Sequence, residues 1–156
     1  MEAIIFVGIQ GAGKSTFFRE RFFDTHVRIN LDMLRTRRRE DMLLAACLQS
    51  GQSFVVDNTN PLPSDRRKYI DPAKAAGFRT IAYFFSTSLR DAMQRNNLRF
   101  GKQKVPAPAL AATFKKIVPP TTEESFDEIY TAELTADGVF NVSPTPHQAN
   151  PSQKSP

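Results

Sequence analysis

Residues 8–15 read Gly-Ile-Gln-Gly-Ala-Gly-Lys-Ser, and they follow directly on the apolar run of residues 3–7, Ala-Ile-Ile-Phe-Val. They complete the pattern G-x-x-x-x-G-K-S/T. In this pattern a buried strand holds a loop whose glycines turn backbone amides toward phosphate oxygens, and the following helix adds the positive end of its dipole. We expect Lys14 to reach the β- and γ-phosphates of a nucleotide and the Ser15 hydroxyl to complete the shell of a magnesium ion. The stretch therefore predicts a phosphate-binding loop.

The same loop defines a set of nucleotide-binding residues. We expect ATP to be held by Gly8, Gln10, Gly11, Ala12, Gly13, Lys14, Ser15 and Thr16. The alternative is a strand and tight turn that contain Gly-Lys-Ser by chance. The strand in front of the loop favours phosphate binding.

Composition bounds what can be built around this loop. The chain has 156 residues, of which 40% are apolar and thirteen are Phe, enough to fill a single core. Its one cysteine, Cys47, excludes an internal disulfide and a cysteine-based metal site, and its apolar neighbours favour a thiol packed in the core. No segment approaches the length of a membrane span, and the first strand begins where a signal sequence would stand. We expect an intracellular protein, cytoplasmic or nuclear, without a membrane partner.

Strand-like and helix-like segments alternate along the chain. Short strands are expected at residues 3–7, 27–30, 53–57 and 80–85. Helical spacing falls between and after them, at residues 15–23, 40–50, 64–76, 89–99 and 107–118. Because buried strands need cover on both sides, the fold predicted is an α/β P-loop NTPase: a parallel β-sheet flanked by helices on both faces, with a helical lid.

The C-terminal part of the sequence predicts where this domain ends. Residues 125–133 read as a last strand, and the turn signal Asp137-Gly138 folds residues 139–142 back as a short hairpin partner. From Ser143 onward, four prolines fall among Ser, Thr, Gln and Asn. We expect one P-loop domain over residues 1–142 and a Pro-rich disordered tail over residues 143–156.

Positive charge is clustered within the net charge of +5. Between residues 28 and 39 five arginines stand against one acidic residue, Asp32, and between residues 90 and 104 five more basic residues stand against Asp91. Two such clusters suit a nucleotide and a second polyanion, which favours nucleic acid as a partner. For Arg37, Arg38 and Arg39 the alternative is a solvated helix face.

In an open α/β sheet, ligand-binding and catalytic residues lie at the carboxyl ends of the strands. Asp32 follows the strand of residues 27–30, where a carboxylate can accept a proton from an attacking hydroxyl; the alternative role is a helix N-cap. Arg35 lies three residues further on, either to bind an acceptor phosphate or to pair with Asp57. Asp57 ends the next strand. Three roles are open for it: it could hold magnesium through water, orient Arg35 or cap the strand.

Arg95 and Arg99 are four residues apart and share one face of the helix expected at residues 89–99. Both are candidates to contact the donor phosphates, with residues 101–106 forming a mobile lid. Two guanidinium groups placed there would stabilise the charge that spreads over the transferred phosphoryl group.

Together these segments resemble the kinase domain of 5′-polynucleotide kinases, within the zeta-toxin-like and AAA-type families of P-loop kinases. The similarity runs from about residue 3 to residue 134 and is carried by residues 8–16, 30–35, 56–61, 95–99 and 101–106. The resemblance implies that Lys14 and Ser15 bind donor phosphate and metal and that Asp32 is the general base. It also implies that Arg35 binds the acceptor's phosphate, that Asp57 supports Arg35, and that Arg95 and Arg99 are lid arginines.

The sequence departs from this family at two points. Many relatives have an arginine or another polar residue where Leu31 stands. Many are also fused to a phosphatase or ligase domain, for which 156 residues leave no room. Any end-healing role is then limited to 5′-phosphorylation, unless a partner enzyme supplies 3′-end processing.

The function predicted is transfer of the γ-phosphate of ATP to the 5′-hydroxyl end of DNA or RNA. ATP and Mg²⁺ are the expected cofactors, Ser15 and Asp57 are the expected metal-binding residues, and nucleic acid repair is the expected process. Two alternatives stay open: a P-loop kinase for a small hydroxylated metabolite, and an ATP-dependent nucleic-acid-binding switch. Asp32 disfavours the switch, because a switch needs no base beside an acceptor.

Overall fold

The computed structural model describes residues 1–146, whose strands form one six-stranded sheet. The strands are β1 (Glu2–Val7), β2 (Val27–Ile29), β3 (Phe54–Val56), β4 (Arg79–Phe85), β5 (Glu128–Leu134) and β6 (Phe140–Pro144). Their order in the sheet is β2-β3-β1-β4-β5-β6; the first five are parallel, and β6 runs antiparallel to β5. The predicted parallel sheet and its closing hairpin are confirmed.

The helices fall close to the predicted ranges. They are α1 (Lys14–Arg21), α2 (Leu31–Leu34), α3 (Arg37–Ser50), α4 (Pro63–Ala75), α5 (Leu89–Asn97) and α6 (Ala107–Lys116), with single 3₁₀ turns η1 (Gly101–Gln103) and η2 (Thr122–Glu124). Helix α3 begins three residues before the predicted start, because the Thr36 side chain accepts a hydrogen bond from the Arg39 amide and caps the helix there.

Two apolar cores, one on each face of the sheet, hold the layers together. Alternate residues of β1 point to opposite faces, so Ile5 packs in one core with Cys47 of α3 and Ile70 of α4. Phe6 packs in the other core with Phe17 of α1, and the same core contains residues of α5 and α6. Helices on both faces, and a buried thiol at Cys47, are therefore confirmed.

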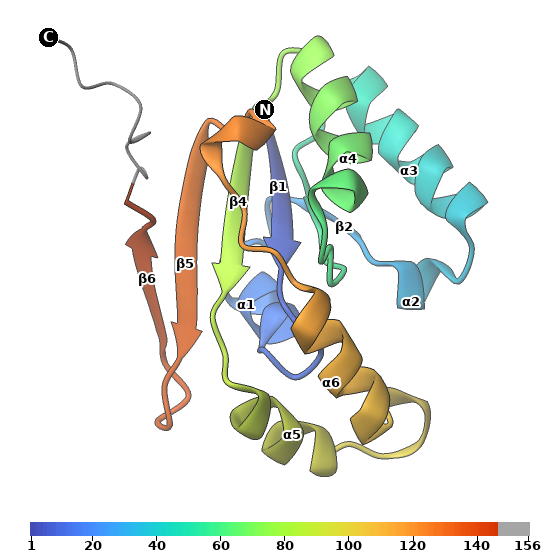
Figure 1. Cartoon of the computed structure of the whole chain (residues 1–156). Coiled ribbons are helices and arrows are strands. Elements are labelled where there is room, and N and C mark those ends of the chain that lie inside the picture. Colours follow the sequence, from blue (N-terminus) through green and yellow to red (C-terminus); the bar gives the residue numbers. More distant parts are fainter. Residues whose placement is uncertain (147–156) are drawn as a thin grey trace, which may run out of the picture.

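The carboxyl ends of the parallel strands all lie at one end of the sheet. Figure 1 shows β1, β4 and β5 pointing toward the end where α1, α5 and α6 gather. Helix α2 lies across from α6 at this end, beyond the tip of β2 (Figure 1). The carboxyl ends of the parallel strands therefore lie at the end of the molecule where these helices gather.

The sheet runs past the boundary predicted at residue 142. Ser143 and Pro144 belong to β6, and the amide of Thr145 donates to the Ile129 carbonyl at 2.9 Å. The rest of the predicted tail, residues 147–156, lies outside the described residues. Within residues 1–146, no helix is both long enough and apolar enough to cross a membrane.

Candidate active site

The phosphate loop follows β1 and has backbone conformations that favour glycine. Gly11 has a φ of 81° and Gly13, the N-cap of α1, has a φ of 92°. A Cβ atom on Gly11 would also lie 2.8 Å from the Ala92 carbonyl oxygen of α5, so the lid helix packs directly on the loop. The Gly8 amide donates to the Thr59 carbonyl at 3.1 Å, which ties the loop to the end of β3.

Lys14 lies buried at the start of α1, and its Nζ donates to the carbonyls of Gly8 and Ile9 at 2.7 Å each. Burial lowers the pKa of Lys14 to about 8; Asp57 and Asp32 oppose this shift and Arg99 adds to it. All three charged groups therefore lie within electrostatic reach of the ammonium group.

Ser15 and Asp57 form a close pair at the base of the site. The Ser15 hydroxyl donates to Asp57 Oδ2 at 3.1 Å, and the Asp57 side chain is only 1% exposed. Arg28 of β2 donates to the same Oδ2 from Nε at 2.8 Å and from Nη2 at 2.7 Å. The ion pair expected between Asp57 and Arg35 is thus wrong, because Arg28 takes that place.

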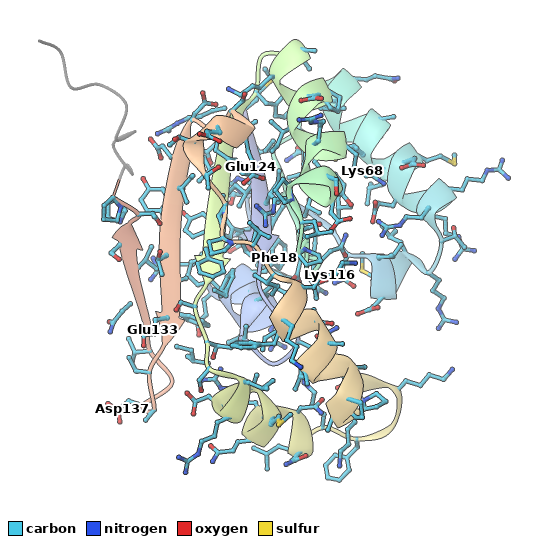
Figure 2. All side chains as sticks on the ribbon, in the orientation of Figure 1. Phe18, Lys68, Lys116, Glu124, Glu133 and Asp137 are labelled. Carbon is cyan, nitrogen blue, oxygen red and sulfur yellow. The ribbon has the colours of Figure 1, made fainter. Side chains whose placement is uncertain are left out.

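A polar cleft of about 570 Å³ opens above these residues. Its lining includes the predicted residues Gln10, Gly11, Gly13, Lys14, Ser15, Thr16, Asp32, Asp57 and Arg99. Gly8 and Ala12 of the same loop are buried. The lining also includes Arg37, Asn58, Lys68, Tyr69 and Lys116, and Figure 2 labels Lys68 on α4 and Lys116 at the end of α6. The cleft thus extends from the phosphate loop to a second surface that bears cationic side chains.

Asp32 stands between these two parts of the cleft, exposed on the short helix α2. The N-cap of α2 is Asn30, whose side chain accepts from the Met33 amide at 2.9 Å, so Asp32 does not serve as the cap. The Leu31 amide donates to Asn58 Oδ1 at 2.8 Å. Side-chain bonds at both ends of this turn hold the Asp32 backbone while its carboxylate faces the cleft.

Asn58 belongs to a buried network centred on Glu40. The carboxylate of Glu40 accepts from Lys68 and Tyr69 at 2.7 Å each, from Arg37 at 3.0 Å and from Asn58 at 3.2 Å. Burial alone would raise the pKa of Glu40, but the bonds from Lys68 and Tyr69 outweigh it and lower the pKa. Burial and the neighbouring carboxylate raise the pKa of the Tyr69 hydroxyl, which stays a donor. Arg37 therefore pairs with Glu40, whereas Arg38 and Arg39 are exposed on α3 and Arg39 donates to the Leu34 carbonyl at 3.3 Å.

Besides Gly8 and Ala12, two predicted site residues lie outside the cleft lining within the described part of the chain: Arg35 and Arg95. Arg35 is exposed at the C-cap of α2 with a φ of 70°. Arg95 donates to the Gly11 carbonyl at 3.0 Å and to Thr87 Oγ1 at 3.1 Å, so it fastens the lid helix to the phosphate loop. Arg99 does line the cleft, but α5 ends at Asn97, so the predicted shared helical face is wrong.

Sequence reasoning missed several residues that the fold brings to the cleft. Arg28 was visible only as one member of a basic cluster, because a strand residue gives no sign of its partner across the sheet. Lys68 and Lys116 stand on helices far apart in the sequence. The repeated Asn residues in Asp57-Asn58-Thr59-Asn60 were the one available signal, since short amides often hold loops.

The oxygen atoms at Ser15 and Asp57 suit a magnesium ion. In the described part of the chain no three carboxylate, imidazole or thiol side chains gather to hold a metal. Magnesium is commonly bound by one or two protein oxygens together with substrate phosphates and water. One hydroxyl and one carboxylate beside a phosphate loop therefore fit this ion only when phosphates complete the shell.

A parallel sheet with a phosphate loop after its central strand, and a helical lid over the loop, defines the α/β P-loop kinase fold. The chain belongs to the AAA domain family AAA_33, whose model matches residues 41–119, just over half of the chain. The match begins after the phosphate loop, which independently completes the P-loop pattern.

Two relatives of known description are similar over most of the chain. One is the "Bifunctional polynucleotide phosphatase/kinase" of Schizosaccharomyces pombe, 26% identical over 132 residues, which cover 82% of this chain and 32% of that protein. The other is a "Putative bifunctional polynucleotide phosphatase/kinase" of Acanthamoeba polyphaga mimivirus, 32% identical over 143 residues, which cover 87% of this chain and 34% of that protein. The chain thus spans about a third of the length of either relative.

The fold is also similar to that of a gluconokinase from Sinorhizobium meliloti. The TM-score is 0.59 at 18% identity, over 85% of this chain and 82% of that one. This likeness is one of fold. Since a sugar-acid kinase has the same architecture, the fold alone does not identify the acceptor.

Proposed function

We propose that this chain is an ATP- and Mg²⁺-dependent polynucleotide 5′-hydroxyl kinase. The observation that carries the proposal is the presence of Lys14 and Asp32 in one cleft, a buried cation on the donor side and an exposed carboxylate toward the acceptor side. Asp32 also acts electrostatically on Lys14, raising its pKa against the effect of burial. Kinases need such a pair, one group for the transferred phosphate and one for the attacking hydroxyl.

The roles of the residues follow from their chemistry. Asp32 accepts the proton of the 5′-hydroxyl as its oxygen bonds to the γ-phosphorus, while the bond from that phosphorus to the β–γ bridging oxygen breaks and ADP leaves. Lys14 and Arg99 stabilise the charge on the transferred group and on the leaving phosphate. Ser15 and Asp57 are the residues that would hold Mg²⁺, which supplies further charge neutralisation when bound. Arg35, exposed just beyond Asp32, is the candidate contact for the acceptor's phosphate.

The acceptor surface supports a polyanionic substrate. Arg37, Lys68 and Lys116 line the cleft together with the phosphate-loop residues, and Arg38 and Arg39 add exposed positive charge on α3. Both named relatives are described as polynucleotide phosphatase/kinases, and their similarity covers most of this chain. A partner enzyme for 3′-end processing is part of the proposal, because both relatives are described as phosphatase/kinases.

The test is transfer of label from γ-labelled ATP to a 5′-hydroxyl oligonucleotide with Mg²⁺, beside the same oligonucleotide already 5′-phosphorylated. We expect label on the first only, in both DNA and RNA series. Asp32→Asn should abolish transfer and keep ATP binding, whereas Asp24→Asn, which removes an exposed carboxylate near the end of α1, should keep both. Retained ATP binding without label on any oligonucleotide would refute the polynucleotide assignment.

A second candidate is a kinase for a small hydroxylated metabolite. The cleft volume of about 570 Å³ lies within the range that holds a single small ligand, and the gluconokinase shares the fold. The salt dependence of acceptor affinity distinguishes the two functions. A polynucleotide acceptor releases counterions on binding, so its affinity falls steeply as the salt concentration rises. An acceptor KM that stays constant between low and moderate salt would favour the metabolite.

A further inference from the structure

The oxygen pair that suits magnesium already binds a cation that belongs to the chain. Asp57 Oδ2 accepts three hydrogen bonds, from Ser15 Oγ and from two nitrogens of Arg28, Nε and Nη2. Arg28 Nη2 also donates to Ser15 Oγ at 2.8 Å. One guanidinium group therefore contacts both residues assigned above to the metal.

We propose that Arg28 competes with Mg²⁺ for Ser15 and Asp57, so that the metal is admitted only together with the phosphates of the nucleotide. The inference rests on the metal role proposed for these two residues. A carboxylate oxygen that accepts three hydrogen bonds has used its lone pairs, and Arg28 must leave before that oxygen can bind a metal or a metal-bound water.

The competition favours Arg28 while nucleotide is absent. Mg²⁺ loses its water ligands only at a high free-energy cost, and one hydroxyl with one carboxylate supplies too few ligands to offset that cost. Guanidinium is weakly hydrated, and at Asp57 it forms charge-assisted bonds of 2.7 and 2.8 Å to a side chain that is only 1% exposed. Triphosphate oxygens change this balance, because they add ligands for the metal and a new anion for the guanidinium.

The Arg28 guanidinium can move away from Asp57 and still pack against a neighbouring side chain. Its side chain is 29% exposed, and its Cζ lies 5.7 Å from the centre of the Phe18 ring on α1. Phe18 is labelled in Figure 2. An aromatic face at this distance stabilises a cation and can hold the guanidinium when it releases the carboxylate. Arg28 would then be a gate for the metal as well as a partner for Asp57.

The direct test measures metal binding without acceptor and without turnover. Mn²⁺ is titrated into the full chain in the absence of nucleotide and followed by electron paramagnetic resonance, with Mg²⁺ competition to relate the two ions. Arg28→Gln should bind Mn²⁺ about ten- to a hundredfold more tightly than wild type, the range expected when a charge-assisted bond no longer competes. Arg21→Gln is the matched control: it removes an arginine that lies over Phe17, at 5.5 Å, and should change binding by less than about twofold.

A folded Arg28→Gln protein that binds Mn²⁺ no more tightly than wild type would overturn the proposal, leaving Arg28 as a fixed partner of Asp57. Since removing one member of a buried pair can unfold a protein, the wild type supplies a second measurement. The Nε–H resonance of Arg28 should stay in place with Mg²⁺ alone and move when Mg²⁺ and ATP are added together. An unchanged resonance in the nucleotide complex would also contradict displacement.

The result of the Mn²⁺-binding test and the result of the oligonucleotide-labelling test can be told apart. Tighter Mn²⁺ binding by Arg28→Gln, with no label on any oligonucleotide, would support the gate and reject the polynucleotide acceptor. Label on a 5′-hydroxyl oligonucleotide, with equal metal affinity in both proteins, would support the kinase and reject the gate.

Discussion

Lys14 provides the sharpest quantitative expectation, because its titration falls in the range of ordinary buffers. Burial lowers its pKa to about 8 from the usual 10.5, and the buried ammonium already donates to two loop carbonyls. Nucleotide phosphates favour the charged form of this group. Binding of ATP therefore raises the pKa of Lys14 and takes up a proton wherever the lysine was neutral.

Linkage gives the sign and the size of the effect. Below pH 8 Lys14 is charged and ATP affinity is nearly constant; above pH 8 each unit weakens binding by up to about tenfold. With a pKa of about 8, the dissociation constant of ATP should rise about tenfold between pH 7 and pH 9, and about three-quarters of a proton should be taken up at pH 8.5. A lysine at the usual 10.5 would change the dissociation constant by only about 3% and take up almost no proton.

Isothermal titration calorimetry at pH 7, 8, 8.5 and 9, in two buffers of different ionisation enthalpy, measures both quantities. Lys14→Gln should bind ATP weakly and show a flat profile. Lys116→Gln, which removes another lysine of the same cleft, should keep the wild-type profile. A wild-type dissociation constant that stays flat from pH 7 to pH 9, without proton uptake, would refute a lowered pKa for Lys14.

Three further predictions concern other cleft residues. Asp32→Asn should lower kcat on the order of a hundredfold or more and change ATP affinity by less than about threefold, measured in single turnovers; an unchanged kcat would reject the base. Arg99→Ala should lower kcat on the order of a thousandfold, whereas Arg95→Ala, which frees the Gly11 carbonyl, should mainly raise the KM for ATP; equal effects would contradict their different places. Glu40→Gln should lower the free energy of unfolding by about 2–4 kcal/mol at pH 7 in urea titrations. Because the pKa of Glu40 is lowered on folding, this difference should shrink as the pH falls through it.

Most of the fold was predictable because its signals are local. The phosphate loop, the buried strands and the turn signal at Asp137-Gly138 each lie within a few residues of sequence. Errors occurred where a single side chain decides a boundary. The Thr36 side chain starts α3 three residues early, and the Thr145 hydroxyl bonds to the Thr131 hydroxyl of β5 at 2.9 Å, beyond the boundary predicted at residue 142.

The site was only partly predictable, because its specificity depends on contacts between distant residues. Placing Asp32 and Asp57 in one cleft followed from the rule that strand ends meet at one edge of a sheet. Which arginine pairs with Asp57 depends on the direction of side chains from β2 and α2. Arg28 of β2 donates to Asp57, whereas Arg35 is exposed at the C-cap of α2 and lies outside the cleft lining.

The segment of residues 57–61 shows how Asp32, the exposed carboxylate that we propose as the base, is held in place. The Thr59 carbonyl accepts from the phosphate loop at 3.1 Å, Asn58 Oδ1 accepts from the Leu31 amide at 2.8 Å, and the Pro61 carbonyl accepts from the Val118 amide, just beyond α6, at 2.8 Å. The phosphate loop, the turn that carries Asp32 and the segment just after α6 are thus all hydrogen-bonded to residues 58–61. In-line transfer tolerates errors of only a fraction of an ångström, and a common frame keeps the three parts in register when any one of them moves. In the proposed kinase, Asp32 can therefore remain open to the acceptor while its backbone stays fixed relative to Lys14.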